Sequence, residues 1–288
     1  MKNKTNILMR IFLLGLCVCC FSGLLAQNAN TQKNLIIIPD SSEFVTLYDA
    51  NEFDLKHSEL FLNWNGYPYI MRGNTIIELL YDSVFNIFEL PDKSSPTQLL
   101  CTTEGITYLK NGKLIQIMKD DDIQTLLTLP DTQFHIGLAD NSLLYITRYI
   151  KDSSTIFLYD TDLFVITKLF TVEGKINDVA GDGLHTYLAK GGEIFLLSDS
   201  EIFKIMEIEQ DITTLALSDY GLFFSTSQSI GYIDIDKPYQ PFPFINKPAK
   251  KLLTWDNQMY IQFNDGTISI LFGLEYFEYF VESIYNNN

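Results

Sequence analysis

The 288-residue sequence predicts an all-β fold, a β-propeller of six blades that each contain four antiparallel strands. Three observations lead to this prediction. A pattern recurs about every 40 residues, a period typical of blade-type repeats. Short apolar runs are rich in β-branched and aromatic residues, and glycine- or asparagine-containing turns separate them. A propeller of seven blades is the alternative that the sequence leaves open.

The repeat becomes visible when one position of each unit serves as an anchor. The anchors are Tyr67, Ile106, Leu143, Leu184, Leu222 and Met259. They are separated by 39, 37, 41, 38 and 37 residues. Each unit reads as an apolar run, an Asp/Asn/Gly turn, an aromatic-rich run, a tight hairpin and two further runs. This order gives the four strands of one blade, which we denote a, b, c and d from the axis outward.

The two ends of the repeat region bear on the number of blades. Six units extend from about residue 57 to residue 283 by this pattern. The segment 34–48 has a further strand pattern, which either closes the last blade or is the remainder of a seventh. Four prolines bar the stretch 237–248 from a central strand, so we expect an edge strand or a surface excursion there. The aromatic run 274–283 fits a strand as well as a helix.

The stretch from Ile212 to Asp234 shows the repeat most clearly. It has the form I-x-x-L, then Asp-x-Gly, two aromatic residues, Ser-Thr and a later Gly. This form resembles the repeats of the periplasmic two-component-regulator propellers, with Phe224 where those repeats prefer Trp. The stretch from Ile176 to Leu197 matches the same form loosely. The resemblance implies a propeller of the same superfamily.

The N-terminus has the three parts of a secretory signal peptide. Basic residues precede an apolar stretch from Ile11 to Cys20, and Ala26 supplies a small residue for cleavage. We therefore expect a signal peptide over residues 1–26 and a single propeller domain over residues 27–288. The start resembles exported proteins of Bacteroidetes-type bacteria. The expected location is the periplasm or the outside of the cell, with no transmembrane helix after cleavage. An uncleaved N-terminal anchor is the alternative.

The cysteines bear on tethering and on redox chemistry. Three of the four lie in the leader, where lipid attachment would tether the protein. The residues before these cysteines are not small, which argues against a lipoprotein. The mature chain would keep only Cys101, so no internal disulfide can form and the fold must hold by packing. Cys101 lies in an apolar run and is expected to be buried.

Charge narrows the classes of partner. The net charge of −16 argues against nucleic acid or anionic membranes as partners. Acidic residues gather in the a–b and c–d turns, which a propeller places on one face. They include Glu104, Asp140, Asp182, Asp219, Asp256, Asp160 and Asp162. Aspartate is a common turn residue because its side chain accepts hydrogen bonds from nearby backbone N–H groups. A surface for cations or basic partners is the sharper interpretation, although no stretch matches a calcium loop.

Basic residues recur at matching points of four b–c hairpins. They are Arg72, Lys110, Arg148 and Lys190, four to six residues after their anchors. In a closed ring these side chains share the face opposite the acidic turns. The functional interpretation is a rim that binds a carboxylated sugar, a phosphate or an acidic peptide. The simpler interpretation is that these charges solvate hairpin tips.

The sequence favours a binding module over an enzyme. The three histidines lack metal-ligand spacing, and the common catalytic and phosphate-binding motifs are absent. His185 is expected in a second strand as a packed core residue. We expect no cofactor and no metal, and a partner protein or glycan of the cell envelope as ligand. The alternative is a propeller-type hydrolase or lyase acting on a carbohydrate or lactone. The oligomeric state is not specified by the sequence.

Overall fold

The computed structural model describes residues 35–286 except for 50–54, 64, 81–82, 91–95, 103–104, 119–122, 129–132, 141, 199–200, 236 and 238–240. The expected leader, its cleavage site and the domain boundary at residue 27 lie outside the described residues. Within residues 36–288 the chain forms one compact unit. The description below concerns that unit.

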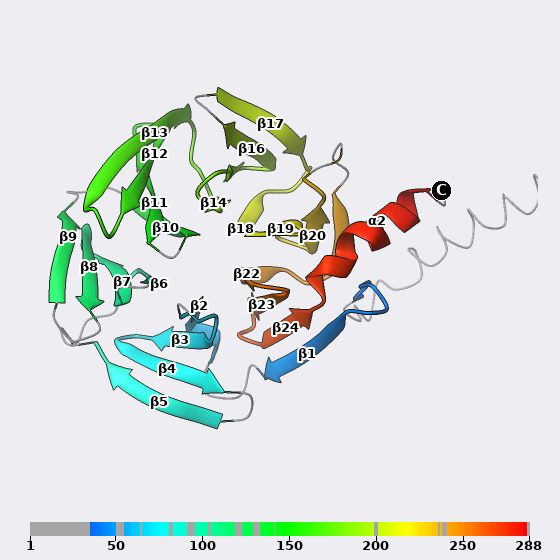
Figure 1. Cartoon of the computed structure of the whole chain (residues 1–288), viewed down its shortest axis with the longest axis horizontal. Coiled ribbons are helices and arrows are strands. Elements are labelled where there is room, and N and C mark those ends of the chain that lie inside the picture. Colours follow the sequence, from blue (N-terminus) through cyan, green and yellow to red (C-terminus); the bar gives the residue numbers. More distant parts are fainter. Residues whose placement is uncertain are drawn as a thin grey trace, which may run out of the picture. The chain divides into compact units, whose positions relative to one another are not determined.

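The unit consists of six antiparallel sheets of four strands, arranged around a common axis (Figure 1). Blade 1 contains β2 (Glu59–Leu62), β3 (Pro68–Arg72), β4 (Thr75–Leu80) and β5 (Ser83–Glu89). Blade 2 contains β6 (Gln98–Thr102), β7 (Gly105–Lys110), β8 (Lys113–Met118) and β9 (Ile123–Thr128). Blade 3 contains β10 (Gln133–Asp140), β11 (Leu143–Ile150), β12 (Ser153–Asp160) and β13 (Val165–Glu173). Blade 4 contains β14 (Asp178–Gly181), β15 (Thr186–Lys190), β16 (Glu193–Ser198) and β17 (Glu201–Glu207). Blade 5 contains β18 (Ile212–Ser218), β19 (Gly221–Thr226), β20 (Ile230–Ile233) and β21 (Phe242–Ile245). Blade 6 contains β22 (Ala249–Trp255), β23 (Gln258–Phe263), β24 (Ile268–Phe272) and β1 (Glu43–Tyr48). The predicted six-bladed propeller is confirmed.

The ring closes by pairing the start of the chain with its last blade. Strand β1 lies antiparallel to β24, with Val45 opposite Ile270, and becomes the outermost strand of blade 6. The strand predicted within residues 34–48 is therefore the closing strand of a six-bladed ring, and the seven-bladed alternative is wrong. Closure covers the outer edge of β24, which removes an exposed strand edge.

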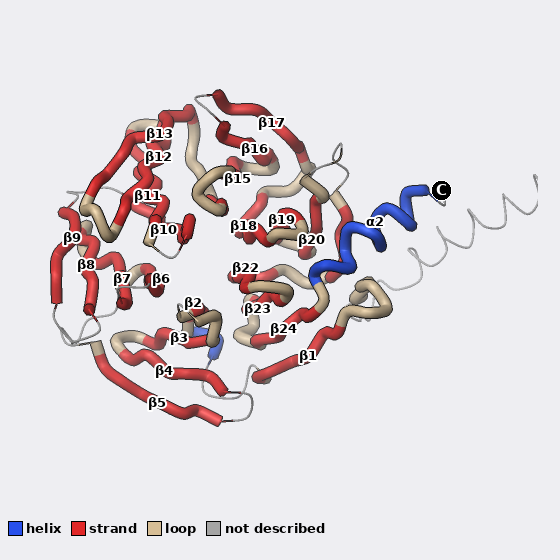
Figure 2. The backbone as a smooth tube through the Cα atoms, in the orientation of Figure 1, coloured by secondary structure: helices blue, strands red, loops and turns tan. Residues whose placement is uncertain are grey.

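Local chemistry sets the hairpins between the strands, and Figure 2 draws the described loops and turns in tan between the red strands. At the β7–β8 hairpin, Asn111 and Gly112 have φ values of 49° and 70°, which gives the two-residue turn that matches strand twist. The Pro-rich stretch contains β21, where Pro243 lies opposite Gly231. Because β21 is the outermost strand of blade 5, the expectation of an edge strand is confirmed.

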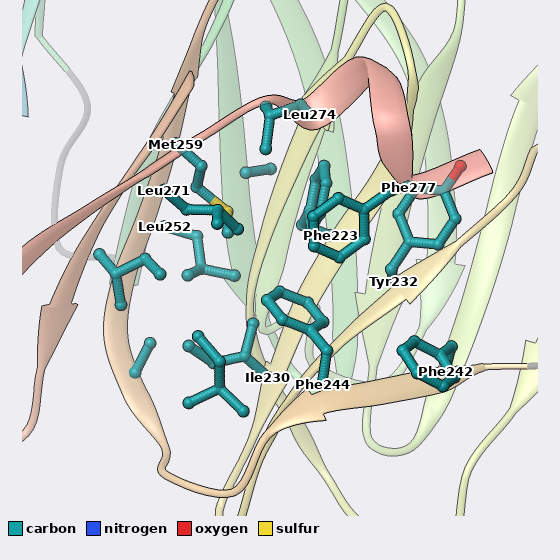
Figure 3. Close-up of a cluster of buried hydrophobic side chains, with 14 of the residues drawn as sticks. Phe223, Ile230, Tyr232, Phe242, Phe244, Leu252, Met259, Leu271, Leu274 and Phe277 are labelled. Atoms are coloured by element: carbon teal, nitrogen blue, oxygen red, sulfur yellow. The ribbon is translucent and has the colours of Figure 1, made fainter. Parts of the chain in front are cut away.

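The chain ends in a helix packed on the largest buried cluster. A short 3-10 turn (η2, Leu274–Tyr276) leads into α2 (Phe277–Asn286), so the aromatic run is helical. Phe277 is fully buried and makes edge-on contacts with Phe223 and Phe244 at centroid distances of 5.5 and 5.0 Å (Figure 3). Aromatic residues spaced by three or four positions form one apolar helix face, which packing favours over a strand here. Among the described residues no helix has the length and apolar character to cross a bilayer.

Strand direction gives the ring two distinct faces. The innermost strands are β2, β6, β10, β14, β18 and β22 (Figure 1). Each inner strand begins beside the b–c hairpin of its own blade. In blade 1, for example, Glu59 at the start of β2 pairs with Met71, and the next residue, Arg72, pairs with Thr75 across the β3–β4 hairpin. We call this side, with its d–a connections and b–c hairpins, the entry face. The side with the a–b and c–d turns, where the inner strands end, is the exit face.

Candidate functional site at the entry face

The inner strands of all six blades line a cavity of about 360 Å³ along the axis. Polar side chains gather where these strands begin, at the entry face. They are Glu59, Gln98, His135, Asp178, Lys250 and Lys251. Near the ends of the strands the lining is mainly apolar, with Leu62, Leu217 and Trp255 among its members. We call the six polar residues the channel mouth.

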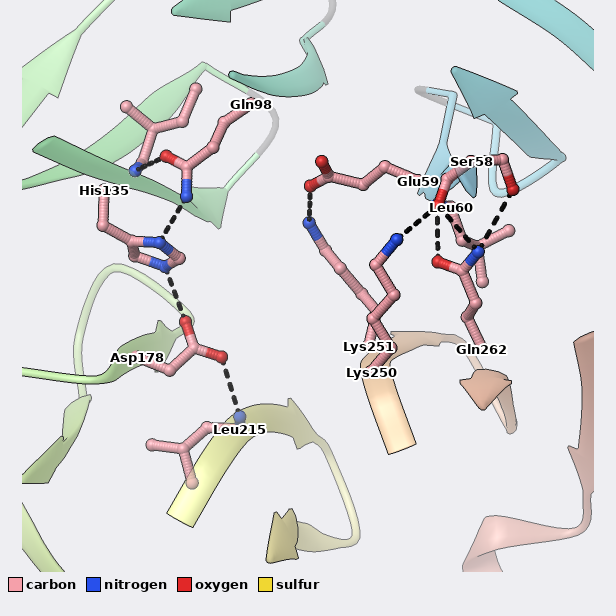
Figure 4. A network of polar contacts seen from close by, with 11 residues as sticks. Ser58, Glu59, Leu60, Gln98, His135, Asp178, Leu215, Lys250, Lys251 and Gln262 are labelled. Carbon is pink, nitrogen blue, oxygen red and sulfur yellow. Dashed lines mark hydrogen bonds and ion pairs between the residues drawn. The ribbon is translucent and has the colours of Figure 1, made fainter. Parts of the chain in front are cut away.

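A chain of hydrogen bonds links four neighbouring blades across half of the channel mouth (Figure 4). The amide nitrogen of Gln98 lies 2.5 Å from His135 Nδ1, and His135 Nε2 lies 2.7 Å from Asp178 Oδ1. The backbone N–H of Leu215 donates to Asp178 Oδ2 at 2.9 Å. Blades 2, 3, 4 and 5 are thus connected through side chains at the mouth.

The backbone determines the direction of every bond in this chain. The N–H of Ile136 can only donate, and it donates to Gln98 Oε1 at 2.7 Å. The amide NH₂ of Gln98 therefore faces His135, so Nδ1 must accept and Nε2 carries the hydrogen that Asp178 accepts. Both ring nitrogens are committed to structural bonds. His135 can act as a proton acceptor only if it gives up one of them.

Asp178 is held as a carboxylate by its partners. Its side chain is only 13% exposed, and burial by itself would raise its pKa. The hydrogen bond from His135, together with the N–H groups of Leu215 and Val179, outweighs burial and lowers the pKa of Asp178 below its ordinary value. The carboxylate is therefore ionised at neutral pH, and both of its oxygens accept hydrogen bonds.

The other half of the channel mouth joins blade 6 to blade 1. Lys251 Nζ lies 3.1 Å from Glu59 Oε1. Lys250 donates to the carbonyl of Ser58, and Gln262 accepts from Leu60 N–H at 3.0 Å (Figure 4). Although Lys250 as a residue is exposed, its ammonium group is partly desolvated. Burial, and then the neighbouring charge of Lys251, lowers the pKa of Lys250, while Glu59 opposes this change.

One rule accounts for many of these contacts. Inner strands have no ladder partner on the axis side, so some of their backbone N–H groups need other acceptors. Side chains of the preceding blade in the ring supply them. The pairs are Gln262 with Leu60 N, Gln98 with Ile136 N, Asp178 with Leu215 N, and Ser225 with Ala249 N. The channel mouth is therefore a set of inter-blade braces, and it forms a preorganised polar surface.

The predicted basic residues all belong to second strands at the entry face. Arg72, Lys110 and Lys190 end β3, β7 and β15, while Arg148 lies within β11 opposite Thr155. Lys190 contacts Glu193 at 3.8 Å and lies over the ring of Phe195. Each directly follows the cross-strand partner of a channel-mouth residue; Arg148, for example, follows Thr147, which pairs with His135. The structure thus brings these four residues to one face, and their anion-binding role stays a prediction.

Of the sequence predictions for the exit face, the one for Asp182 agrees with the structure and the one for His185 does not. Asp182 accepts hydrogen bonds from the N–H groups of Leu184 and His185, which agrees with aspartate as a turn residue. The prediction that His185 is a packed core residue is wrong: its side chain is 53% exposed, because it lies in the a–b turn before β15. Cys101 is buried, as expected. Glu104 lies outside the described residues.

Sequence reasoning missed the channel mouth because it followed the apolar anchors of the second strands. A detectable signal was present at the starts of the first strands. Gln98, His135 and Asp178 are separated by 37 and 43 residues, close to the repeat period. A polar residue recurring at that point of an apolar run indicates a side chain directed to the axis rather than into a blade. Among the described residues, no three His, Cys, Asp or Glu side chains are placed to hold a metal ion.

Comparisons with known proteins agree with the architecture. No protein-family model matches the sequence, and no curated protein matches it. Among solved structures, the gluconolactonase XC5397 from Xanthomonas campestris matches with a TM-score of 0.61 at 12% identity, covering 85% of this chain and 96% of that one. Virginiamycin B lyase from Staphylococcus aureus matches with a TM-score of 0.54 at 14% identity, covering 81% and 99%. PorZ, a surface component of the type-IX secretion system of Porphyromonas gingivalis, matches with a TM-score of 0.52 at 10% identity, covering 78% and 34%. At these identities the likeness shows a shared propeller fold.

Proposed function

We propose that the chain is an exported, non-enzymatic β-propeller that binds a partner protein or glycan of the cell envelope through its entry face. The leader pattern of residues 1–26 supports export. One observation carries the proposal: the channel mouth uses its imidazole and its two carboxylates as inter-blade contacts. Groups fixed in this way form a rigid surface for ligand recognition and are not available as a general base.

The charges of the entry face favour an acidic ligand. Lys250 and Lys251 lie at the channel mouth, and Arg72, Lys110, Arg148 and Lys190 belong to the second strands around it. A carboxylate or phosphate approaching this face meets ammonium and guanidinium donors. The ligand class is therefore a carboxylated sugar, a phosphate-bearing group or an acidic peptide.

Calorimetric titration with an oligogalacturonate, with inorganic phosphate and with a poly-glutamate peptide tests the proposal. We expect saturable binding of at least one of them that weakens with salt. The double variant Arg72→Ala/Arg148→Ala should lose about tenfold in affinity, whereas Lys168→Ala, an exposed change on outer strand β13, should bind normally. Equal affinities for the double variant and the wild type would exclude the basic residues as the binding surface.

A second candidate is a hydrolase or lyase acting on a carbohydrate or lactone. The close pair of His135 and Asp178 in the axial cavity is the observation that favours it. The gluconolactonase and the lyase among the structural neighbours are consistent with it. Hydrolysis of gluconolactone above the spontaneous rate, abolished in His135→Ala and retained in Arg72→Ala, would replace the first proposal with this one.

A further inference from the structure

A second cleft opens on the exit face, between blade 6 and blade 1. Its volume is about 250 Å³. The outer part consists of Asn65, Gly66, Tyr67, Trp255, Asp256 and Gln258, which we call the inter-blade cleft. Its floor is buried and includes Tyr260 and Ile270. The cleft lies at the opposite end of the ring from the channel mouth, so it is distinct from the site proposed above.

Two aromatic side chains form walls of the inter-blade cleft. The indole of Trp255 packs against Gly66 so closely that a Cβ at that position would lie 2.4 Å from the ring. Gly66 also has φ of +77°, a conformation that glycine adopts without strain. The indole is thereby fixed between the two blades. Tyr67, next in the chain, leaves 49% of its surface exposed. A half-exposed tyrosine beside a fixed indole provides apolar surface for a flat ligand.

Polar groups surround these aromatic walls. Asn65 and Asp256 are exposed, and Gln258 is half-buried with its amide donating to Tyr260 Oη at 3.3 Å. Asn63 accepts from the backbone N–H groups of Asn65 and Tyr67, which holds this turn in place. An amide, a carboxylate and a second amide around aromatic surface can donate to and accept from several hydroxyl groups at once.

Size and charge narrow the ligand class. The volume is below the range of roughly 300–1,000 Å³ for pockets that take drug-sized ligands, so a single six-membered ring fits better than a nucleotide. The carboxylate of Asp256 disfavours anionic ligands. A pyranose has apolar C–H faces that stack on aromatic rings and a rim of hydroxyls that meets amides and carboxylates. We propose that the inter-blade cleft binds one neutral pyranose ring, as a free sugar or as the terminal residue of a glycan.

Calorimetry with glucose, galactose, mannose and N-acetylglucosamine tests this proposal directly. We expect one of them to bind with a dissociation constant of about 1 mM or tighter. Tyr67→Ala should weaken that binding at least about tenfold, and Tyr67→Phe should retain it because the ring is preserved. Asparagine readily adopts the φ of 48° observed at position 256. Asp256→Asn should therefore fold normally and weaken binding to a smaller extent. The control is Tyr279→Ala on α2, an exposed tyrosine outside the cleft.

The outcomes separate this site from the proposed function. Sugar binding that persists in Arg72→Ala/Arg148→Ala and disappears in Tyr67→Ala supports a distinct saccharide site, whatever the entry face binds. Absence of binding for every sugar overturns the proposal, and so does binding that Tyr67→Ala leaves unchanged. A correctly folded Tyr67→Ala protein, verified by circular dichroism, excludes misfolding as the cause of a loss.

Discussion

Neighbouring blades are held together by different interactions at the two ends of the channel. At the entry face, side chains such as Gln98 and Asp178 accept hydrogen bonds from backbone N–H groups of the next blade. At the exit face, Trp255 packs on Gly66 across the junction of the last and first blades, with an apolar lining nearby. The entry face is braced by directional hydrogen bonds, and the junction of blades 6 and 1 at the exit face is held by close packing.

The difference teaches where substitutions are tolerated. A hydrogen-bond brace fails when one partner is removed, because the remaining buried group loses its partner. A packed junction fails when volume is added, because a close-packed interior cannot accommodate another atom. The entry face should therefore be sensitive to deletion of polar atoms, and the junction of blades 6 and 1 at the exit face to addition of carbon atoms.

The largest effect is expected from Asp178→Ala. The change removes the acceptor for His135 and for the N–H groups of Leu215 and Val179 in a largely buried position. We expect a loss of about 3 kcal/mol in the free energy of unfolding, measured by urea denaturation. Asp178→Asn keeps one acceptor oxygen and should cost less. Equal costs for the two variants would show that acceptance by the carboxylate does not brace the entry face.

Gly66→Ala tests the packed end by adding one carbon. The new Cβ would overlap the Trp255 ring, and alanine would have to adopt a left-handed φ. We therefore expect the free energy of unfolding, measured by urea denaturation, to fall by about 2 kcal/mol. Gly183→Ala is the matched control. Its φ is +87°, but its Cβ would meet Leu143 at an ordinary 3.4 Å. If both variants lose the same stability, the cost comes from backbone strain and close packing at Trp255 is not the cause.

Acid should weaken the entry-face brace selectively. The pKa of Asp178 is lower in the folded protein than in the unfolded chain, so its ionisation stabilises the fold above the unfolded value of about 4. That stabilisation is lost as the pH falls through the folded pKa. The urea midpoint of the wild type should therefore fall more steeply between about pH 5 and pH 3 than that of Asp178→Asn. Parallel pH profiles would assign the acid sensitivity to other carboxylates.

Much of the fold could be predicted from the sequence because a propeller repeats its own rules. The apolar run Leu99–Cys101 became β6 (Gln98–Thr102), and the Asn111–Gly112 pair marked a hairpin with positive φ values. The helix α2 could not be assigned, because its aromatic residues fit either structure until Phe277 packs on Phe223. Tertiary contacts, not local propensity, settle such a segment.

The candidate site was less predictable for a related reason. His135 and Asp178 are distant in the sequence and meet only because adjacent blades begin their inner strands side by side. Spacing near the repeat period indicates that they occupy equivalent positions, but not that their side chains join. The His185 prediction failed for a different reason: β15 begins one residue after His185, so His185 lies in the turn and its side chain is exposed.

The smallest effect on stability is expected from Tyr67→Ala, although its effect on sugar binding should be large. Tyr67 is 49% exposed and its backbone N–H, which donates to Asn63, is unchanged by the substitution. We expect the free energy of unfolding to change by less than about 0.5 kcal/mol in urea denaturation, as for other exposed positions. A much larger loss would make Tyr67 part of the packed junction with Trp255. In that case the exit face would depend on two aromatic side chains for its stability, and the half-exposed tyrosine would no longer argue for a ligand.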